Sequence, residues 1–232
     1  MIDLTVIIPV YNEVRTIKKI INKISKIKIK KQIIVVDDCS TDGTINQILK
    51  NKSKINKILF HKINLGKGAA IRTAQKFVKG KYVIIQDADL EYEPSDYFKI
   101  INKLKKKNCN VVYGSRVLGK KRYSLKNFTS TSRIFFNHLL TILSNILNKQ
   151  KLTDAHTCYK AFNSRIFKKI KLQENGFAFC PEITTKVSNL KLNIVEVPIN
   201  YNGRSYKDGK KITYFDGLEA IHALIQYKLW QK

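Results

Sequence analysis

Short runs of apolar residues alternate, in the first half of the chain, with segments in which apolar residues recur every three or four positions. The runs have the length of strands and lie within residues 4–10, 32–38, 57–61, 82–86 and 110–114. The intervening segments have helical spacing and cover about residues 14–24, 44–50, 66–79 and 94–106. We therefore expect an α/β protein whose largely parallel central sheet carries helices on both faces.

The second half contains two longer helical patterns. Residues 133–148 have an unusually broad apolar face, too short to span a bilayer but suited to lying against one. Burial of this face in the core or in a dimer is an equal alternative. A last helix, over residues 213–230, would place five apolar residues on one side: Phe215, Leu218, Ile221, Ile225 and Leu229. No repeat or linker divides the chain, so we expect a single domain over residues 1–232.

The composition is strongly basic. The 232 residues include 44 Lys and Arg against 17 Asp and Glu, a net charge of +27, and 44% are hydrophobic, enough for a core. Such a charge favours polyanions or anionic membranes as partners. The alternative is that abundant Lys, Ile and Asn together reflect an AT-rich genome. No aromatic stripe or nucleic-acid-binding motif accompanies the charge, so we expect no nucleic-acid partner.

The four cysteines indicate a reducing environment. Cys39, Cys109, Cys158 and Cys180 are scattered and lack the spacing of a zinc site, so we expect free thiols. No stretch reaches the roughly 18 apolar residues of a spanning helix, and the first residues have the pattern of a strand rather than a signal peptide. We expect a cytoplasmic protein that is not integral to a membrane.

Three carboxylates follow the strand at residues 82–86. Asp87, Asp89 and Glu91 are spaced two apart, so they point the same way if the chain stays extended. Clustered carboxylates repel one another unless a cation lies among them, and hard oxygen ligands suit Mg²⁺ or Mn²⁺. The alternative is an acidic turn that caps the helix starting near Pro94. In open α/β sheets, however, ligands bind beyond the carboxyl ends of the strands.

Two other strands also end in polar clusters. Asp37 and Asp38 follow the second strand, and either can accept a hydrogen bond from the ring N–H of uracil or guanine, or from a ribose hydroxyl. The segment "NLGKGAA" opens a helix with two glycines and Lys67, where backbone N–H groups favour phosphate. The alternatives are an ordinary turn and a solvated lysine.

These motifs together resemble a known family. The segments "TVIIPVYNE", "IIVVDDCSTDGT", "NLGKGAAIRTA" and "YVIIQDADLEYEP" have the order and spacing of family-2 inverting glycosyltransferases of GT-A fold. The segments "YGSRVLG", "LTDAHTCYKAF", "GFAFCPEITTKV" and "EVPINYNGRSYKDGKKI" resemble the branch that contains dolichol-phosphate mannose synthase and polyprenyl-phosphate glucosyltransferases. The resemblance covers essentially the whole chain. The segment "DAHTCYKAF" departs from the Ser-Gly-Phe form of some relatives, which weakens the transfer of acceptor details.

The resemblance implies roles for matching residues. The nucleotide site would comprise Pro9, Tyr11, Glu13, Asp37, Asp38, Lys67, Asp87 and Ala88. The metal ligands would be Asp87, Asp89 and Glu91, the last standing where many relatives carry Gln. The acceptor and its phosphates would meet Arg116, Arg133, Glu182, Arg204, Lys207 and Lys211, although the lysines also suit a solvated loop. The catalytic residues would be Asp89, Asp154 and Arg116.

The resemblance also implies an activity. A hexose would pass with inversion from a UDP- or GDP-linked donor to a polyprenyl or dolichyl phosphate at the cytoplasmic membrane face, with Mg²⁺ or Mn²⁺ as cofactor. Residues 1–118 would bind the nucleotide sugar and residues 119–232 the acceptor. Attachment would be peripheral, to an anionic membrane or a membrane partner protein, and a homo-oligomer is compatible with the pattern.

The sequence leaves two other enzymatic activities as alternatives. One is transfer to a hydroxyl acceptor in surface polysaccharide or glycolipid synthesis, which needs a base: Asp154 first, Glu182 second. A sugar-nucleotide pyrophosphorylase fits less well, because "PVYNEVRT" lacks the glycines typical of its first loop.

Overall fold

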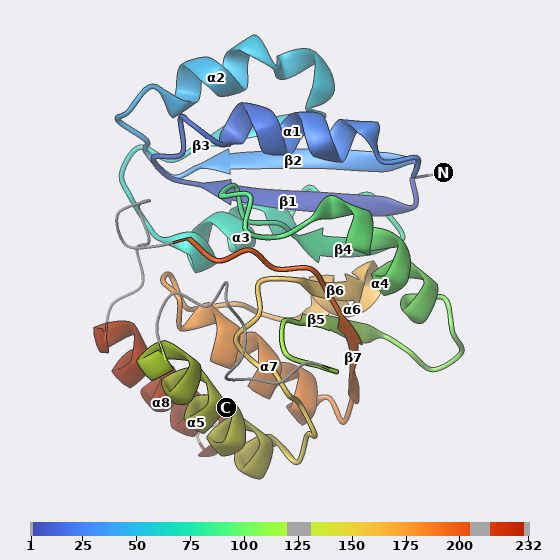
Figure 1. Cartoon of the computed structure of the whole chain (residues 1–232), viewed down its shortest axis with the longest axis vertical. Coiled ribbons are helices and arrows are strands. Elements are labelled where there is room, and N and C mark those ends of the chain that lie inside the picture. The colour runs from blue at the N-terminus through green and yellow to red at the C-terminus, as the bar shows by residue number, and fades with distance from the viewer. Residues whose placement is uncertain (1, 120–130, 205–213, 230–232) are drawn as a thin grey trace.

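The computed structural model describes residues 2–119, 131–204 and 214–229, although the side chains of residues 131–133 and 214 are not described. One sheet runs through the described chain, with the strand order β3-β2-β1-β4-β6-β5-β7 (Figure 1). Its strands are β1 (Leu4–Val10), β2 (Lys31–Asp37), β3 (Lys57–Phe60), β4 (Tyr82–Ile85), β5 (Val111–Ser115), β6 (Lys160–Asn163) and β7 (Ile194–Pro198).

The sheet is largely parallel, as predicted. β3, β2, β1 and β4 form a continuous parallel block, and β5 pairs with β7 in parallel. β6 runs antiparallel to both of its neighbours, β4 and β5. Because β6 comes from the second half of the chain and lies between two strands of the first, the two halves share one sheet.

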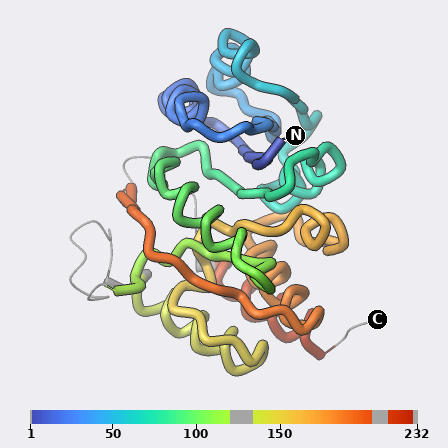
Figure 2. The backbone as a smooth tube through the Cα atoms, turned by 90° about the vertical axis from the view of Figure 1, so that its right-hand side faces the viewer, coloured from blue at the N-terminus to red at the C-terminus, as the bar shows by residue number. Residues whose placement is uncertain are grey.

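Helices cover both faces of the sheet. They are α1 (Ile17–Lys26), α2 (Thr44–Lys50), α3 (Lys67–Gln75), α4 (Tyr97–Leu104), α5 (Thr131–Asn148), α6 (Ser164–Lys169), α7 (Phe179–Asn189) and α8 (Tyr214–Leu229), with short 3₁₀ turns at Lys52–Lys54 and Pro94–Asp96. Seen along the strands, α1 and α4 lie on one face and α3 and α6 on the other (Figure 2). The predicted arrangement of layers is therefore confirmed.

The core is built mainly from β-branched and aliphatic residues. β1 and β4 are buried at every position, which matches their uninterrupted apolar sequences. α1 shows the amphipathic pattern expected of a surface helix, because Ile17, Ile20, Ile21 and Ile24 are fully buried while its lysines face solvent. This packing fixes the strands whose ends carry the polar clusters.

The helices α5 and α8 turn large apolar side chains outward. On α8, Ala220, Ala223 and Leu224 are buried, and much of the apolar side predicted from the sequence faces solvent instead. On α5, the buried positions include small polar residues such as Thr141 and Ser144. No helix within the described ranges combines the length and the hydropathy needed to cross a membrane.

Candidate functional site

The polar clusters predicted at the strand ends come together because the strands are parallel neighbours. Val10 at the end of β1 is in register with Asp37 at the end of β2, and Ile7 of β1 is in register with Ile85 at the end of β4. The segments that follow these strands therefore leave the same edge of the sheet. Asp37 is the last residue of β2, and Glu13 and Asp87 lie on the segments that follow β1 and β4.

A guanidinium group lies among the carboxylates at this edge. The Nη atoms of Arg204 donate to Glu13 at 3.0 and 3.1 Å and to Asp89 at 3.2 Å. The Nε atom of Arg204 lies 3.7 Å from Oε1 of Glu91, and that oxygen accepts a hydrogen bond from the backbone N–H of Arg204 at 2.8 Å. We call Glu13, Asp87, Asp89 and Glu91 the carboxylate cluster. In this conformation Arg204 supplies positive charge to three of its members.

The cluster has a strongly perturbed member. The pKa of Asp89 is raised to about 7, first by burial and then by the negative charges of Asp87 and Glu91, while the positive charge of Arg204 lowers it. The raised pKa reflects the burial of Asp89 and the two negative charges beside it. The cluster is thus an environment that favours additional positive charge.

The donor chemistry of the cluster suits a divalent cation. All its ligating atoms are carboxylate oxygens, the type that Mg²⁺ and Mn²⁺ prefer. As the side chains lie, no group of three or more His, Cys, Asp or Glu within the described residues is arranged around a metal position. The guanidinium of Arg204 lies directly against two of these carboxylates, Glu13 and Asp89.

Lys67 is paired with Asp87 at the start of α3. Its Nζ lies 2.5 Å from Oδ1 of Asp87 and 5.9 Å from the centre of the Phe177 ring. Burial lowers the pKa of Lys67, but the charge and hydrogen bond of Asp87, together with Cys158 and Cys180, outweigh this effect and hold the pKa well above its ordinary value. The Lys67–Asp87 ion pair therefore connects the N-terminus of α3 to the carboxylate cluster. A helix N-terminus favours bound phosphate groups.

Asp37 and Asp38 have different surroundings. The carboxylate of Asp38 accepts hydrogen bonds from the backbone of Leu65 at 2.9 Å and of Gly66 at 2.7 Å, and its Oδ1 lies 2.6 Å from the ring of His61. Asp38 therefore holds the loop that precedes α3. In Asp37, Oδ1 accepts from the backbone of Ser40, while Oδ2 is buried and has no hydrogen-bond partner in the described part of the chain. Oδ2 of Asp37 can therefore accept a hydrogen bond from a ligand.

Arg116 and Asp154 form a bidentate ion pair. Nε and Nη2 of Arg116 each lie 2.7 Å from an oxygen of Asp154, and the backbone N–H of Arg116 donates to the same carboxylate at 3.0 Å. Burial raises the pKa of Asp154, but Arg116 outweighs it and the pKa is lowered. A carboxylate held this way is a weak base and a firm anchor for the guanidinium.

Tyr201 connects the two groups of charges and was not predicted from the sequence. Its hydroxyl donates to Glu91 at 2.7 Å, and its ring lies 5.2 Å from the guanidinium carbon of Arg116. Its ring also packs edge-on against Tyr92, with 5.2 Å between the ring centres. In the sequence, Tyr201 is marked by its position three residues before Arg204. In the structure, its segment forms one isolated β-bridge with Tyr92.

The remaining predicted residues lie near strand ends or on a helix, or fall outside the described residues. Pro9 and Ala88 are buried, and Tyr11 is half-buried directly after β1. The carboxylate of Glu182 is fully buried on α7 and accepts from the backbone N–H groups of Gln173 and Glu174 and from Lys186. It therefore supports a loop. The side chain of Arg133, together with Lys207 and Lys211, falls outside the described residues.

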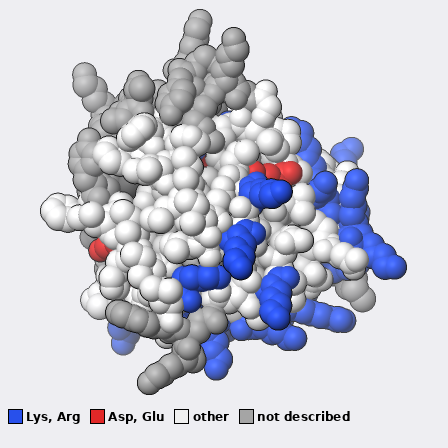
Figure 3. Space-filling model, turned by 90° about the horizontal axis from the view of Figure 1, so that it is seen from below, with Lys and Arg blue, Asp and Glu red and all other residues white. Residues whose placement is uncertain are grey.

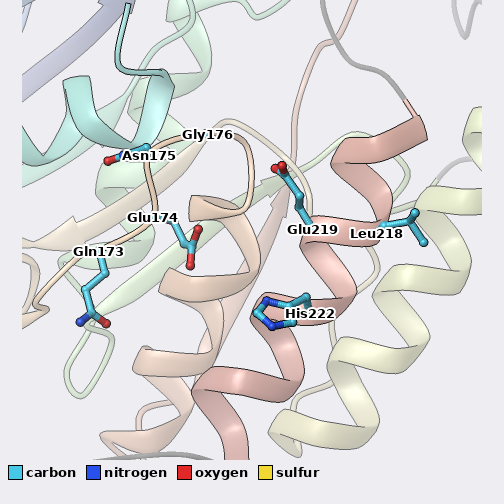
Figure 4. A pocket seen from close by; sticks show the side chains of 7 residues that line it. All are labelled: Gln173, Glu174, Asn175, Gly176, Leu218, Glu219 and His222. Atoms are coloured by element: carbon cyan, nitrogen blue, oxygen red, sulfur yellow. The ribbon is translucent and has the colours of Figure 1, made fainter.

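A pocket of about 600 Å³ lies apart from these residues, between α8 and the loop before α7 (Figure 4). It is lined by Gln173, Glu174, Asn175, Gly176, Leu218, Glu219 and His222. None of the predicted site residues lines it. The candidate site is therefore the strand-end edge rather than this pocket.

Comparison with known proteins identifies the family. The family model described as Glycosyl transferase family 2 matches residues 5–171. A dolichyl-phosphate beta-glucosyltransferase of Trichomonas vaginalis is 28% identical, over 99% of this chain and 74% of the relative. A UDP-N-acetylglucosamine–dolichyl-phosphate N-acetylglucosaminyltransferase of Methanococcus voltae is also 28% identical, over 96% of this chain and 95% of the relative.

Solved structures show the same fold. Glucosyl-3-phosphoglycerate synthase from Mycobacterium tuberculosis superposes with a TM-score of 0.76 at 15% identity, over 99% of this chain and 82% of that one. The same enzyme in complex with Mn²⁺, uridine diphosphate and glucosyl-3-phosphoglycerate gives a TM-score of 0.74 at 16% identity, over 99% and 81%. The predicted GT-A fold is confirmed.

Proposed function

Because this chain belongs to glycosyl transferase family 2, we propose that it transfers a hexose, with inversion, from a UDP- or GDP-linked donor to a polyprenyl or dolichyl phosphate. The dolichyl-phosphate transferases among its relatives support a lipid phosphate as the acceptor. The observation that carries the proposal is the carboxylate cluster at the strand ends, adjacent to Lys67 at the start of α3.

The donor would bind along this edge. Oδ2 of Asp37, buried and without a partner among the described residues, is available to accept from the base or the ribose. Lys67 and the first backbone N–H groups of α3 would contact the diphosphate. Asp87, Asp89 and Glu91 would hold Mg²⁺ or Mn²⁺, a proposal supported by the complexes of the Mycobacterium tuberculosis enzyme with these metals and uridine diphosphate. When bound, the cation would neutralise charge that develops on the leaving nucleoside diphosphate.

Arg204 would change partners when the donor binds. Its guanidinium contacts the same carboxylates that we propose as cation ligands. A cation and an arginine at one position repel each other, so Arg204 would turn to the phosphate oxygens, which accept bidentate hydrogen bonds. Pro9, Tyr11, Glu13, Asp38 and Ala88 would then line or support the nucleotide site.

Arg116 is our candidate for binding the acceptor phosphate. Asp154 fixes its guanidinium, and Tyr201 packs against it. A phosphomonoester has a second pKa of about 6, so its attacking oxygen is mostly deprotonated at neutral pH and needs no strong base. The lowered pKa of Asp154 fits this chemistry, and Asp154 then acts as a positioning residue rather than a base. Arg133, Lys207 and Lys211 remain proposed phosphate contacts.

Transfer to a hydroxyl acceptor is the second candidate, and it requires a free carboxylate as a base. Both carboxylates proposed for that role are already bound: Asp154 by Arg116, and Glu182 by two backbone N–H groups and Lys186. This observation favours the lipid phosphate.

The place of action is also part of the proposal. A polyprenyl acceptor lies in a bilayer, and a chain with a net charge of +27 is attracted to anionic lipid. We propose peripheral action at the cytoplasmic membrane face, with residues 1–118 serving the donor and residues 119–232 the acceptor. A membrane partner protein or a homo-oligomer is compatible with this scheme.

The test compares two lipids that differ only in the phosphate. Purified protein is incubated with Mn²⁺ or Mg²⁺, radiolabelled UDP- or GDP-sugars, and either a short polyprenyl phosphate or the polyprenol of the same length. We expect label in the organic phase only with the phosphate and only with metal. Equal transfer to the polyprenol would overturn the lipid-phosphate proposal and leave the hydroxyl-directed reaction.

A further inference from the structure

The most unusual surface of the molecule is formed by α5 and α8. Among the described residues of α5, five large apolar side chains are exposed: Phe135, Phe136, Leu139, Ile142 and Ile146. Four more are exposed on α8: Phe215, Leu218, Ile225 and Leu229. We call these nine residues the apolar face. Their exposed fractions range from 40% at Ile225 to 77% at Phe215, so all nine side chains are open to solvent.

The burial pattern of α5 differs from that of an ordinary surface helix, although Ile134 is buried. Thr141, Ser144 and Asn148 face inward, at 3%, 1% and 1% exposure, while phenylalanine and leucine face outward. Most of the inward polar atoms have partners: Thr141 donates to the backbone of Asn137, and the amide nitrogen of Asn148 donates to Ser144 and Thr185. The side-chain oxygen of Asn148 is buried without a partner among the described residues. The orientation of α5 is thus fixed by packing, and its apolar side is left for something outside the fold.

The charged residues around the apolar face indicate which kind of surface it contacts. Seen from below, the molecule shows a broad uncharged area bordered by Lys and Arg side chains on its right and lower margins (Figure 3). α5 contains no acidic residue, whereas α8 carries Asp216 and Glu219 in its N-terminal half. The exposed Lys149, Lys151 and Lys191 lie around the C-terminal end of α5, where Ser188 of α7 bonds to Asn148. Apolar side chains bordered by lysines match a bilayer surface, with acyl chains beneath anionic headgroups.

We infer that the apolar face of α5 and α8 docks on an anionic lipid bilayer, with both helices in the headgroup–acyl boundary. A symmetric dimer through this face is disfavoured, because it would bring the lysines of two copies toward one another. The inference deepens the proposed function and rests on it for the reason of docking, since a polyprenyl acceptor must be reached in its bilayer. Its test needs neither donor nor acceptor.

The test is sedimentation with vesicles that contain no polyprenyl phosphate. The full chain is mixed with vesicles of phosphatidylcholine and phosphatidylglycerol in equal amounts, or of phosphatidylcholine alone. We compare wild type with Phe136→Ser/Leu139→Ser on α5 and Leu218→Ser/Leu229→Ser on α8. The matched control, Ile63→Ser/Phe98→Ser, removes two exposed apolar side chains outside the apolar face. Circular dichroism verifies that each variant is folded.

We expect wild type and control to bind the anionic vesicles, and each face variant to bind at least about tenfold more weakly because two apolar side chains no longer enter the bilayer. Binding to neutral vesicles should be weaker than to anionic ones for all proteins. The inference is overturned if the face variants bind like the control. It is also overturned if wild type ignores vesicles and sediments as a dimer that the face variants convert to monomers. Failure of the transfer assay with vesicle binding intact would reject the proposed reaction but not the docking.

Discussion

At the scale of single residues, the site is held by cation–carboxylate contacts, which the proposed donor would rearrange on binding. Arg204 interacts with Glu13, Asp89 and Glu91, while Lys67 pairs with Asp87. All four carboxylates of the cluster therefore have a protein cation nearby in this conformation. A metal ion bound to these carboxylates would take the place of the guanidinium of Arg204. Mutation of Arg204 therefore tests whether the two cations compete for the same carboxylates.

Arg204→Ala should bind Mn²⁺ alone several-fold more tightly than wild type, because the guanidinium no longer competes for Glu13 and Asp89. The measurement is titration of free Mn²⁺ by electron paramagnetic resonance at pH 8 without nucleotide. Arg165→Ala, an exposed arginine on α6, is the control and should match wild type. Unchanged or weaker Mn²⁺ binding by Arg204→Ala would show that Arg204 does not occupy a cation site.

Asp154→Asn separates a positioning role from a basic one. If Asp154 only fixes Arg116, the variant should raise the KM for polyprenyl phosphate by about tenfold or more, with a smaller change in kcat. Arg116→Lys, which loses the bidentate geometry, should give the same pattern. A fall in kcat of about a thousandfold at unchanged KM would instead identify Asp154 as the base.

The residue scale also shows how far the sequence predicts the site. Spacing alone placed Asp87, Asp89 and Glu91 after a strand and Lys67 at a helix start, and the structure brings them together because β1, β2 and β4 are parallel neighbours. Tyr201 and the pairing of Arg116 with Asp154 could not be predicted. These contacts join residues 38 and 110 positions apart, and the order of the later strands was unknown.

At the scale of elements, the start of α3 is held very close to the loop before α7. A Cβ atom on Gly68 would overlap the carbonyl oxygen of Glu174 and lie 2.9 Å from Cβ of Phe179. The same loop is held by Glu182, which accepts from Gln173 and Glu174. Close packing here places Lys67 beside Asp87.

Gly68→Ala should therefore lower the free energy of unfolding by about 2 kcal/mol, since backbone must move to admit the methyl group. Gly217→Ala is the matched control: a methyl group on this helical glycine of α8 meets nothing within 4 Å. It should be neutral or stabilise by up to about 1 kcal/mol. Urea unfolding of both variants measures the difference, and equal stability of the two would contradict the close approach.

The elements that the sequence did not predict are short or atypical. β6 has four residues and α6 has six, lengths at which periodicity carries little information. α7 contains Pro181 in its first turn and the β-branched pair Thr184 and Thr185, which reduce its helical signal. The elements of the first half were predictable because each has a complete apolar run or repeat.

At the scale of the whole molecule, buried titratable groups link stability to pH. Burial and the nearby Lys160 lower the pKa of His156 to about 3, although Asp154 acts in the opposite direction. In the unfolded chain the pKa is about 6.5, so between these values the unfolded state binds a proton that the folded state does not. The contribution of His156 to stability is complete above pH 6.5 and is lost as the pH falls toward 3.

His156→Gln should remove this dependence. Compared with wild type, its free energy of unfolding should fall less steeply between pH 6.5 and pH 4, as measured by urea unfolding at several pH values. Measurements at pH 8, above both pKa values, give the effect of the substitution that does not depend on pH. Parallel curves for the two proteins over this range would contradict a neutral buried histidine.

The central claim for the molecule is that sugar transfer takes place at the carboxylate cluster. The most direct measurement is the initial rate of label transfer from the preferred nucleotide sugar to polyprenyl phosphate, with and without metal, for wild type, Asp89→Asn and Glu93→Gln. Glu93 lies in the same segment, and within the described ranges its carboxylate pairs with Lys23 at the surface, so its variant should retain the wild-type rate. We predict that Asp89→Asn lowers the metal-dependent rate by about a hundredfold or more. A rate for Asp89→Asn equal to that of Glu93→Gln would contradict the account.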